Sequence, residues 1–419
     1  MLDYVRGTLH AGDIRLLFIT RAVRMFAYGF LSVVLVLYLT ALEMSEGRIG
    51  LLLTLTLAGD TIISLWLTTR ADRLGRRKML VAGAGLMVFA GVMFAMTRDP
   101  LLLLIAGIIG VISPSGKEVG PFLAIEQASL SHVISDDRRT GIFAWYALAG
   151  SLAAALGALA GGVLFESLRH FGMPPIESYR VLIFGYAGIG LLLAVLFLRL
   201  SGAVEAEAPK AGAGVVKSLL GLHESRGVVL RLSGLFALDA FAGGFVMDSF
   251  VAYWFYVRFA INPAIIGAIL FGSNLLAGVS ALLAARIAER FGLINTMVFT
   301  HLPSNVLLIL VPLMPNVWLA IAVLLMRFAI SQMDVPTRQS FTMAVVRPSE
   351  RSAAAGITGV ARTIGAAMAP VLAGMMLGRQ SLASMPFFAA GGLKIVYDLM
   401  LYRSFVRVRP ACDKAGGVA

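Results

Sequence analysis

The sequence predicts an all-α polytopic membrane protein of twelve transmembrane helices, arranged as two pseudo-symmetric six-helix bundles. Of its 419 residues, 59% are apolar and 14% are charged, and the mean hydropathy is +0.87. Soluble proteins carry about 25% charged residues. Apolar runs of about 20 residues, long enough to cross a bilayer as a helix, recur along the whole chain. One charged segment occurs in both halves, which indicates duplication of one helical unit.

The duplicated segment lies between two apolar runs in each half. Residues 72–77 read Asp-Arg-Leu-Gly-Arg-Arg, and residues 289–292 read Glu-Arg-Phe-Gly. At nearly the same separation, Glu350-Arg351 repeats Asp137-Arg138 at the start of the predicted eleventh and fifth spans. Such internal repeats are common in secondary transporters.

Twelve apolar segments, separated by polar or helix-breaking residues, are predicted to span the membrane. Several are longer than a helix needs to cross about 30 Å of hydrocarbon, so we expect them to tilt or to project from the bilayer. The predicted spans are residues 14–42, 47–69, 78–97, 100–132, 139–166, 178–200, 229–258, 262–288, 293–314, 316–346, 352–377 and 383–405.

The stretch between the sixth and seventh spans has a different composition. Residues 201–214 are rich in Gly, Ala and Glu, as expected of a flexible linker, and Val215–His223 have the pattern of a short helix on the membrane surface. The predicted domains are an N-terminal bundle (1–200), a cytoplasmic linker (201–228), a C-terminal bundle (229–405) and a cytoplasmic tail (406–419).

Basic residues lie at the ends of the apolar runs, and their distribution predicts the orientation. The odd-numbered connections carry six Lys or Arg residues, and the tails and even-numbered connections carry most of the others. The positive-inside rule therefore places both termini in the cytoplasm, and we expect a multi-pass protein of a bacterial inner membrane or a plasma membrane. Because the net charge of +12 follows the spans, it does not indicate a nucleic-acid partner.

The segment between the second and third spans resembles the signature of the major facilitator superfamily, Gly-x-x-x-Asp-Arg-x-Gly-Arg-Arg. Thr68 occupies the position of the first glycine, and the remaining signature positions match. Together with the twelve spans and the duplication, the resemblance covers essentially the whole chain. It implies secondary active transport of a small solute by two bundles that open a central site to each side of the membrane in turn.

The signature also carries a predicted gating cluster. A carboxylate at the cytoplasmic end of the second span accepts hydrogen bonds from a nearby helix N-terminus and pairs with an arginine. Asp136 and Asp137, in the next cytoplasmic loop, are candidate counter-charges. We expect these charges to latch the two halves, although topology alone would also explain them. The predicted gating residues are Asp72, Arg73, Gly75, Arg76, Arg77, Glu289 and Arg290.

The fifth span carries small residues between positions 150 and 162 at a spacing that lets two helices approach closely. The pattern resembles the antiporter signature of the same superfamily, Gly-Pro-x-x-Gly-Gly, but Ala158 replaces the proline. Two interpretations stay open, which are drug–proton antiport and generic helix packing.

Ionisable residues inside spans are costly and usually face a partner or a water-filled cavity. Two sets of polar residues, in the first and tenth spans, have the spacing of one helical face. Pro336 is expected to bend the tenth span. The resemblance implies that spans one, four, seven and ten line the central cavity. The predicted substrate-binding residues are Arg21, Arg24, Tyr28, Lys117, Asp239, Arg327, Asp334, Arg338 and Arg362.

The excess of cations in this set supports two readings. Guanidinium groups that outnumber carboxylates suit an anionic solute bound through a carboxylate or phosphate. Alternatively the charges neutralise one another, and the protein is an efflux antiporter for neutral or lipophilic compounds. The second reading predicts the internal pairs Arg24–Glu118, Lys117–Asp239 and Arg338–Asp334. The first predicts that Arg24→Ala and Arg338→Ala abolish transport and leave folding intact.

Proton coupling requires a buried carboxylate whose proton affinity changes as water reaches it. The candidates are Glu126, Asp239 and Asp60, in that order, and each is equally explained as a static hydrogen-bonded residue. A histidine side chain ordinarily titrates near neutral pH, but the resemblance places the ninth span, with His301, outside the cavity, so His301 is not among the expected coupling residues. Lys394 and Asp398 are one helical turn apart and are expected to neutralise each other.

The sequence argues against other function classes. It has no His-Glu-x-x-His, Gly-x-Ser-x-Gly or paired-histidine pattern, and its one cysteine, Cys412, lies in the tail. We therefore expect no enzyme, no metal and no cofactor. It has no phosphate-binding Gly-x-x-x-x-Gly-Lys-Ser/Thr loop either, so ATP-driven transport is not expected. The expected partners are a small-molecule substrate and the lipid bilayer, with the chain acting as a monomer.

Overall fold

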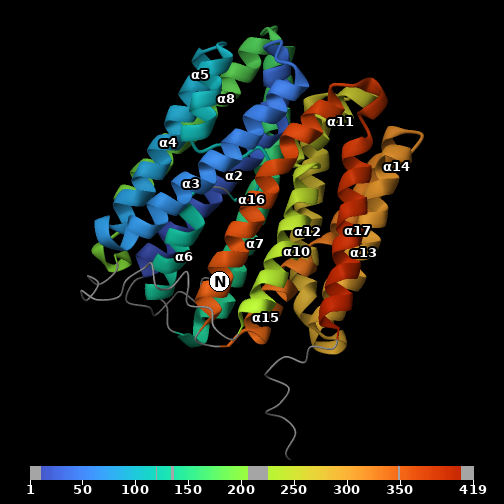
Figure 1. The fold of residues 1–419 in the computed structure, drawn as a ribbon. Coiled ribbons are helices and arrows are strands. Elements are labelled where there is room, and N and C mark those ends of the chain that lie inside the picture. The colour runs from blue at the N-terminus through green and yellow to red at the C-terminus, as the bar shows by residue number, and fades with distance from the viewer. Residues whose placement is uncertain (1–10, 119, 134–135, 206–224, 348–349, 407–419) are drawn as a thin grey trace, which may run out of the picture. The chain divides into compact units, whose positions relative to one another are not determined.

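The computed structural model describes residues 11–118, 120–133, 136–205, 225–347 and 350–406. These residues form helices, with no strand among them, which confirms the predicted all-α class (Figure 1). The first half contains α2 (Ala11–Ala41), α3 (Glu46–Leu74), α4 (Arg76–Met96), α5 (Pro100–Ile109), α6 (Phe122–Val133), α7 (Asp136–His170), α8 (Pro175–Leu198) and η1 (Gly202–Val204). The second half contains α10 (Arg226–Gly244), α11 (Asp248–Phe259), α12 (Pro263–Phe291), α13 (Leu293–Leu310), η2 (Val311–Leu313), α14 (Val317–Ser331), α15 (Asp334–Val345), α16 (Arg351–Leu377), η4 (Gln380–Leu382) and α17 (Met385–Phe405).

The chain packs as two compact units. Unit 1 comprises Met1–Gly212 and Met247–Asn274, and unit 2 comprises Ala213–Val246 and Leu275–Ala419. The predicted boundaries of the two bundles at residues 200 and 229 stay a prediction. The predicted surface segment Val215–His223 lies outside the described residues, as does the tail from residue 407 with Cys412.

The same pairs of helices form in both units. In unit 1, α2 packs along α7 and α4 packs along α8. In unit 2, α10 packs along α16 and α13 packs along α17. In each half these are the first and fifth spans and the third and sixth spans. Duplication of one six-helix unit predicts this repetition.

Small residues let the paired helices approach closely. A Cβ atom at Gly157 of α7 would collide with the backbone of Phe26 in α2. At the matching place in unit 2, a Cβ atom at Gly365 of α16 would collide with the backbone of Ala237 in α10. The small-residue stretch of the fifth span therefore serves helix packing within unit 1.

The predicted fourth span is not one helix. α5 ends at Ile109, α6 begins at Phe122, and the described residues between them are not helical. Pro114, Gly116 and Pro121 fall in this segment, where the two prolines cannot donate backbone hydrogen bonds and Gly116 has a φ of 62°. The expectation of a continuous helix over residues 100–132 was therefore wrong.

The seventh and tenth spans are also interrupted. α10 ends at the Gly243-Gly244 pair, and α11 begins four residues after Gly244, at Asp248. α14 ends at Ser331 and α15 begins at Asp334. Pro336 lies in the first turn of α15, where its missing N–H leaves no helical bond unmade. It therefore follows a break, instead of bending a continuous helix as predicted.

Contacts within unit 1 hold α11 against the first and second spans. The hydroxyl of Ser249 donates to the carbonyl of Ser32 in α2, at 2.8 Å, and the hydroxyl of Tyr253 donates to Glu46 Oε1 in α3, at 2.6 Å. These bonds explain why α11 belongs to unit 1 although α10 belongs to unit 2.

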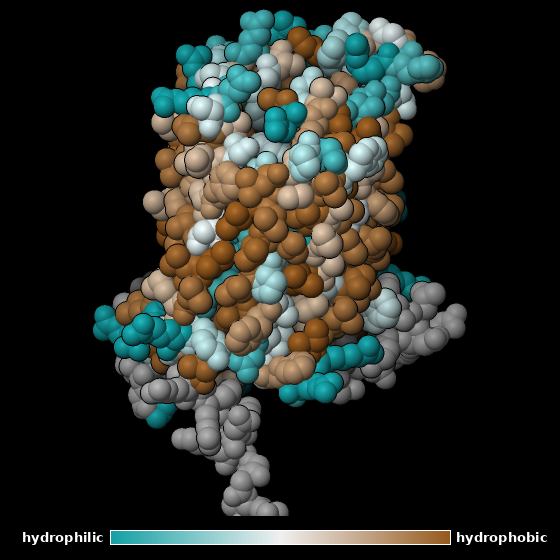
Figure 2. Space-filling view, turned by 90° about the vertical axis from the view of Figure 1, so that its right-hand side faces the viewer, coloured by the Kyte–Doolittle hydropathy of each residue, from teal (hydrophilic) through white to brown (hydrophobic). Residues whose placement is uncertain are grey.

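Ten helical segments of the described chain are long and apolar enough to cross a membrane, counting α10 with α11 and α14 with α15. The broken fourth span and α17, which carries Lys394, Asp398 and Arg403, account for the remainder of the predicted twelve. Figure 2 shows a broad belt of apolar side chains on the face that is turned to the viewer. In unit 2, Phe299 and Trp318 are among the large apolar side chains that lie exposed. Lipid is the solvent that suits such a surface.

Candidate functional site

Unit 1 contains a buried charge cluster centred on Arg24 of α2. The Nη1 and Nη2 atoms of Arg24 each donate to a different oxygen of Glu126 in α6, both at 2.7 Å, and its Nε donates to Glu118 at 2.9 Å. Arg24 and Glu126 are fully buried. The bidentate geometry is the strongest form of an arginine–carboxylate pair.

The same cluster includes Arg21, one turn earlier on α2. Its Nη1 donates to Glu118 Oε2 at 2.6 Å, and its Nε donates to the carbonyl of Tyr146 in α7 at 2.8 Å. The hydroxyls of Tyr146 and Thr20 both donate to Glu126. Two arginines therefore meet two carboxylates, and the cluster, which we call the unit 1 cluster, is balanced in charge.

Unit 2 contains a second buried cluster, which we call the Asp239 cluster. Oδ2 of Asp239 in α10 accepts from Arg338 of α15 at 3.0 Å and from Arg362 of α16 at 3.3 Å. Oδ1 accepts from Lys394 of α17 at 2.5 Å. Asp334, one turn from Arg338, accepts a further bond from it at 3.0 Å. Three helices of unit 2 thus each bring a cation to one carboxylate on a fourth helix.

The Asp239 cluster is not balanced. Its three cations, Arg338, Arg362 and Lys394, face two carboxylates. The side chain of Arg362 is 34% exposed, compared with 8% for Arg338 and 10% for Lys394. Arg362 is therefore the member of the cluster with the most access to a ligand.

A histidine–carboxylate pair lies in the same unit between α13 and α17. The Nδ1 atom of His301 lies 2.8 Å from Oδ1 of Asp398, and Nδ2 of Asn305 donates to Oδ2 of Asp398 at 2.9 Å. All three side chains are buried. Lys394 bonds Asp239 and Asp398 bonds His301, so the expected neutralisation of Lys394 by Asp398 was wrong.

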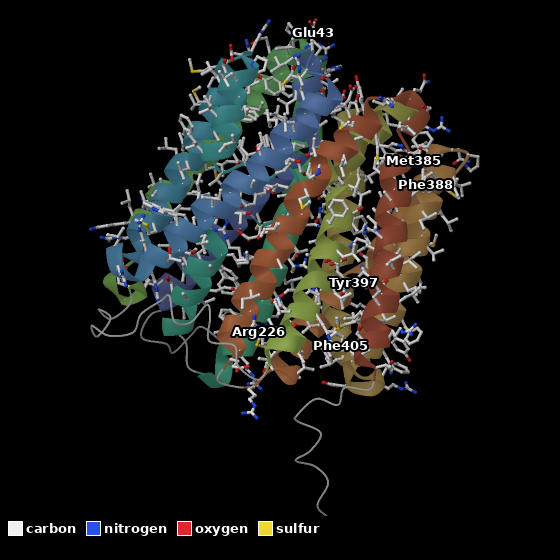
Figure 3. The ribbon with its side chains drawn as sticks, in the orientation of Figure 1. Glu43, Arg226, Met385, Phe388, Tyr397 and Phe405 are labelled. Atoms are coloured by element: carbon white, nitrogen blue, oxygen red, sulfur yellow. The ribbon has the colours of Figure 1, made fainter. Side chains whose placement is uncertain are left out.

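α17 presents these groups along its length. Met385 and Phe388 mark one end of the helix, Phe405 marks the other, and Tyr397 lies between them (Figure 3). The buried Tyr397 ring makes an edge contact with the ring of His301 and packs in an apolar core with Phe236, Met297 and Phe341. This core fixes α10, α13, α15 and α17 around the charges.

The remaining predicted substrate-binding residues are spread over both units. Tyr28 is fully buried in α2, and Arg327 is buried in α14 with its guanidinium over the ring of Phe328. Lys117 is exposed in the non-helical segment before α6. Asp239 takes all three of its cations from unit 2, so the alternative pair Lys117–Asp239 gains no support.

The signature segment forms a sharp corner between α3 and α4. Gly75 adopts a φ of 105°, which favours glycine, and the following backbone N–H groups of Arg76 and Arg77 donate to the carboxylate of Glu205 at 2.5 and 3.2 Å. A carboxylate is stabilised at such a helix N-terminus. Glu205, which follows η1, was missed because it lies far along the chain in the expected linker.

In the part of the chain that it describes, the structure gives no contact that would support a latch for the other predicted gating residues. Arg73 is exposed in the last turn of α3, and Glu289 and Arg290 are exposed in the last turn of α12. The side chains of Asp72, Asp136 and Asp137 lie outside the described residues, so the predicted latch stays a prediction. Among the described residues, no group of three or more His, Cys, Asp or Glu side chains is placed to hold a metal ion.

Comparisons with known proteins agree with this architecture. The family model of the Major Facilitator Superfamily matches residues 17–370. The uncharacterized membrane protein YJR124C of Saccharomyces cerevisiae is 30% identical over 433 residues, covering 97% of this chain and 96% of that protein. A Na(+), Li(+), K(+)/H(+) antiporter of Planococcus maritimus is 29% identical over 151 residues, or 36% of this chain and 34% of that protein.

A solved structure shows the same fold. A single-residue mutant of the nucleoside transporter NupG superposes with a TM-score of 0.74 at 14% identity, covering 94% of this chain and 99% of that chain. The family match extends over most of the chain and includes every helix of the two charge clusters except α17, which carries Lys394. The chain therefore belongs to the Major Facilitator Superfamily of multi-pass membrane transporters.

Proposed function

We propose that the chain is a secondary active transporter that moves a small anionic solute by alternating access, coupled to protons. The observation that carries the proposal is the excess positive charge of the Asp239 cluster. A carboxylate or phosphate of the solute would supply the missing negative charge, and arginine binds such groups with two parallel hydrogen bonds.

Arg362 is the proposed first contact for the solute. Its bond to Asp239, at 3.3 Å, is the longest of the three that reach this carboxylate, and its side chain is the most exposed. A solute anion that binds to Arg362 therefore replaces only the longest of these three bonds. Arg338 and Arg362 both bond Oδ2 of Asp239, and Arg338 and Asp239 complete the proposed binding site.

The unit 1 cluster has a different proposed role. Arg21 and Arg24 were predicted to bind substrate, but Glu118 and Glu126 satisfy both guanidinium groups in a buried site. Removing such a pair from water is costly, and breaking it costs more. We infer that these residues hold α2, α6 and α7 as a rigid body, and that they do not take up the solute charge.

Among the proton candidates, Asp60 gains support relative to Glu126 and to Asp239, whose oxygens already accept from three cations. Both carboxylate oxygens of Glu126 already accept hydrogen bonds, from Arg24, Thr20 and Tyr146, so neither is readily available to bind a proton. Asp60 of α3 accepts from the hydroxyl of Ser64 at 3.4 Å and pairs with no cation of the described chain. The partial relative from Planococcus maritimus is named a cation/proton antiporter, which also favours proton coupling.

The alternative is an efflux antiporter for neutral or lipophilic compounds. It is favoured by the internal pairs Arg24–Glu118 and Arg338–Asp334, two of the three that it requires. In this case Arg362 would remain bound to Asp239 throughout transport, and anions would not bind.

Binding separates the two functions. Purified protein is heated with citrate, succinate or glucose 6-phosphate, and separately with tetraphenylphosphonium or ethidium. The proposal expects the anions to raise the melting temperature and the lipophilic cations to leave it unchanged. Stabilisation by the lipophilic cations alone would favour the efflux antiporter.

Flux then tests the coupling. Each stabilising compound is added outside proteoliposomes that contain the pH indicator pyranine. Uptake together with protons acidifies the lumen, and exchange against protons makes it alkaline. An unchanged lumen during measured solute uptake would exclude both coupling schemes.

The proposed topology has both termini in the cytoplasm and the chain acting as a monomer. Because Cys412 is the only cysteine in the sequence, it reports on the C-terminal tail without engineering. An impermeant maleimide should label Cys412 only after cells are permeabilised. Labelling of Cys412 in intact cells would show that the C-terminal tail lies outside the cell and would contradict the proposed orientation.

A further inference from the structure

A buried polar group, formed by His301, Asn305 and Asp398, has no role in the transport cycle proposed above. The exposed fraction is 4% for His301 and zero for the other two residues. His301 and Asn305 are one turn apart on α13, and Asp398 reaches them from α17. A buried carboxylate and imidazole that face each other are costly unless their protons are arranged to match.

The hydrogen-bond geometry favours an extra proton on this group. The amide Nδ2 of Asn305 lies 2.9 Å from Oδ2 of Asp398 and 3.2 Å from Nδ1 of His301, and an amide nitrogen can only donate. If Nδ1 accepts from this amide, the 2.8 Å contact between Nδ1 and Oδ1 of Asp398 holds a proton on Oδ1, and the lone pair of Nδ1 is shared between the two donors. In this state the imidazole and the carboxyl are both neutral.

The group has a second arrangement without that proton. If the proton on Oδ1 of Asp398 passes to Nδ1 of His301 and Nε2 releases its proton to water, Nδ1 becomes the donor to the ionised carboxylate. The amide of Asn305 then turns, and its Oδ1 atom, which has no partner among the described residues, becomes available to Nδ1–H. The two arrangements differ by one proton and by one negative charge on Asp398.

Lys394 connects this charge to the Asp239 cluster. Lys394 and Asp398 are one turn apart on α17, and Lys394 donates to Asp239. An ionised Asp398 would compete with Asp239 for the ammonium group. The charged and titratable groups that are not exposed on the packed helices are Lys394, Tyr397 and Tyr402 on α17, Arg327 on α14, Asp334 and Arg338 on α15, Asp239 on α10 and Arg362 on α16.

We propose that His301, Asn305 and Asp398 are a proton-binding site coupled through Lys394 to the Asp239 cluster. Proton binding keeps Lys394 on Asp239 and preserves the excess positive charge that an anion needs. Proton release makes unit 2 more negative and weakens anion binding. Linkage requires the reverse effect to be equal, so a bound anion favours proton uptake, and the two travel in the same direction. This direction rests on the proposed function, whereas proton binding itself does not.

Nitrogen NMR of the full chain tests the site without any substrate. His10, His132, His170 and His223, the other four histidines, are replaced by glutamine, and the remaining His301 is labelled with nitrogen-15. We expect Nδ1 to change from an acceptor signal to a donor signal as the pH rises from about 5 to 9. Asp398→Asn should abolish this change, and Lys394→Met should shift its midpoint.

The control is Thr300→Val, a neighbour on α13 whose hydroxyl bonds only the backbone of Thr296. It should leave the His301 titration unchanged. A His301 signal that does not move with pH in the otherwise intact chain would overturn the proposal, and that result needs no variant within the cluster. A midpoint that is the same in Lys394→Met would overturn the coupling to Asp239. If anions neither bind nor move while His301 titrates as expected, the proposed function fails and this site stands.

Discussion

The unit 1 cluster and the Asp239 cluster differ in the number of carboxylates that each cation contacts. In unit 1, Arg24 bonds two carboxylates, so the loss of one still leaves the other. In unit 2, Arg338, Arg362 and Lys394 depend on the same carboxylate, and only Arg338 has a second one. A buried cation without a partner is strongly destabilising.

The number of carboxylates per cation determines which cluster can respond to a ligand. A balanced and closed cluster gains nothing from a further charge, whereas a cluster with a spare, partly exposed cation does. Arg362 has that property and Arg24 does not. We therefore associate stability with the unit 1 cluster and solute recognition with the Asp239 cluster, although duplication made the two halves alike.

The largest expected effect is that of Asp239→Asn. It leaves the buried Lys394 and the partly exposed Arg362 without a carboxylate, and breaking a buried pair such as Lys394–Asp239 costs about 3–5 kcal/mol. Denaturant titration in mixed micelles measures the free energy of unfolding. The control is Asp99→Asn, because asparagine caps the start of α5 as well as aspartate does. Equal stability of the two variants would contradict the single-carboxylate account.

Glu126→Gln should cost less than Asp239→Asn. Arg24 keeps its bond to Glu118, so the loss corresponds to charge-assisted hydrogen bonds, about 1.5–3 kcal/mol. The same titration measures it. If Glu126→Gln proves the more damaging of the two, the idea that unit 1 is the redundant cluster is wrong.

A double substitution tests whether Lys394 and Asp239 depend on each other. Lys394→Met removes one of the cations that Asp239→Asn leaves unpaired, so the double variant should recover about 0.5–3 kcal/mol relative to the sum of the single changes. Additive losses would mean that Lys394 and Asp239 do not depend on each other.

The smallest effect is expected at the surface. Glu177 and Arg180 form an ion pair one turn apart on α8, and the Glu177 side chain is 50% exposed. Glu177→Gln should change the free energy of unfolding by less than about 0.5 kcal/mol. This variant sets the scale against which the buried clusters are judged, and a loss as large as that of Glu126→Gln would show that burial is not the deciding factor.

The structure also changes one expectation drawn from the sequence. Arg24→Ala and Arg338→Ala were expected to abolish transport without affecting folding. Each guanidinium group is buried and bonded to two carboxylates, so both substitutions should destabilise the protein as well. The more exposed Arg362 is the better probe of transport alone.

Local pattern predicted most of the fold. Hydropathy located the spans, and the small residues around Gly157 marked a close helix contact. The break in the fourth span was missed although Pro114, Gly116 and Pro121 signal it. Hydropathy averaged over a long window is dominated by the apolar residues on either side, so it does not register these helix-breaking residues.

The partners of the charges were harder to predict. Neighbours on one helix can be read from spacing, which led to the expected pair Lys394–Asp398. The structure instead joins Lys394 to Asp239 on another helix. Such pairings depend on how α10 and α17 pack, and one sequence contains no direct signal of that contact.

Anion affinity in two matched variants distinguishes the roles of the two clusters. The dissociation constant of the best-stabilising anion is measured by isothermal titration for Arg362→Ala of the Asp239 cluster and for Arg21→Ala of the unit 1 cluster. The account predicts that Arg362→Ala weakens binding by about tenfold or more, the equivalent of one charge-assisted hydrogen bond, and that Arg21→Ala leaves it within about twofold. Undiminished binding by Arg362→Ala, or a larger loss in Arg21→Ala, would contradict it.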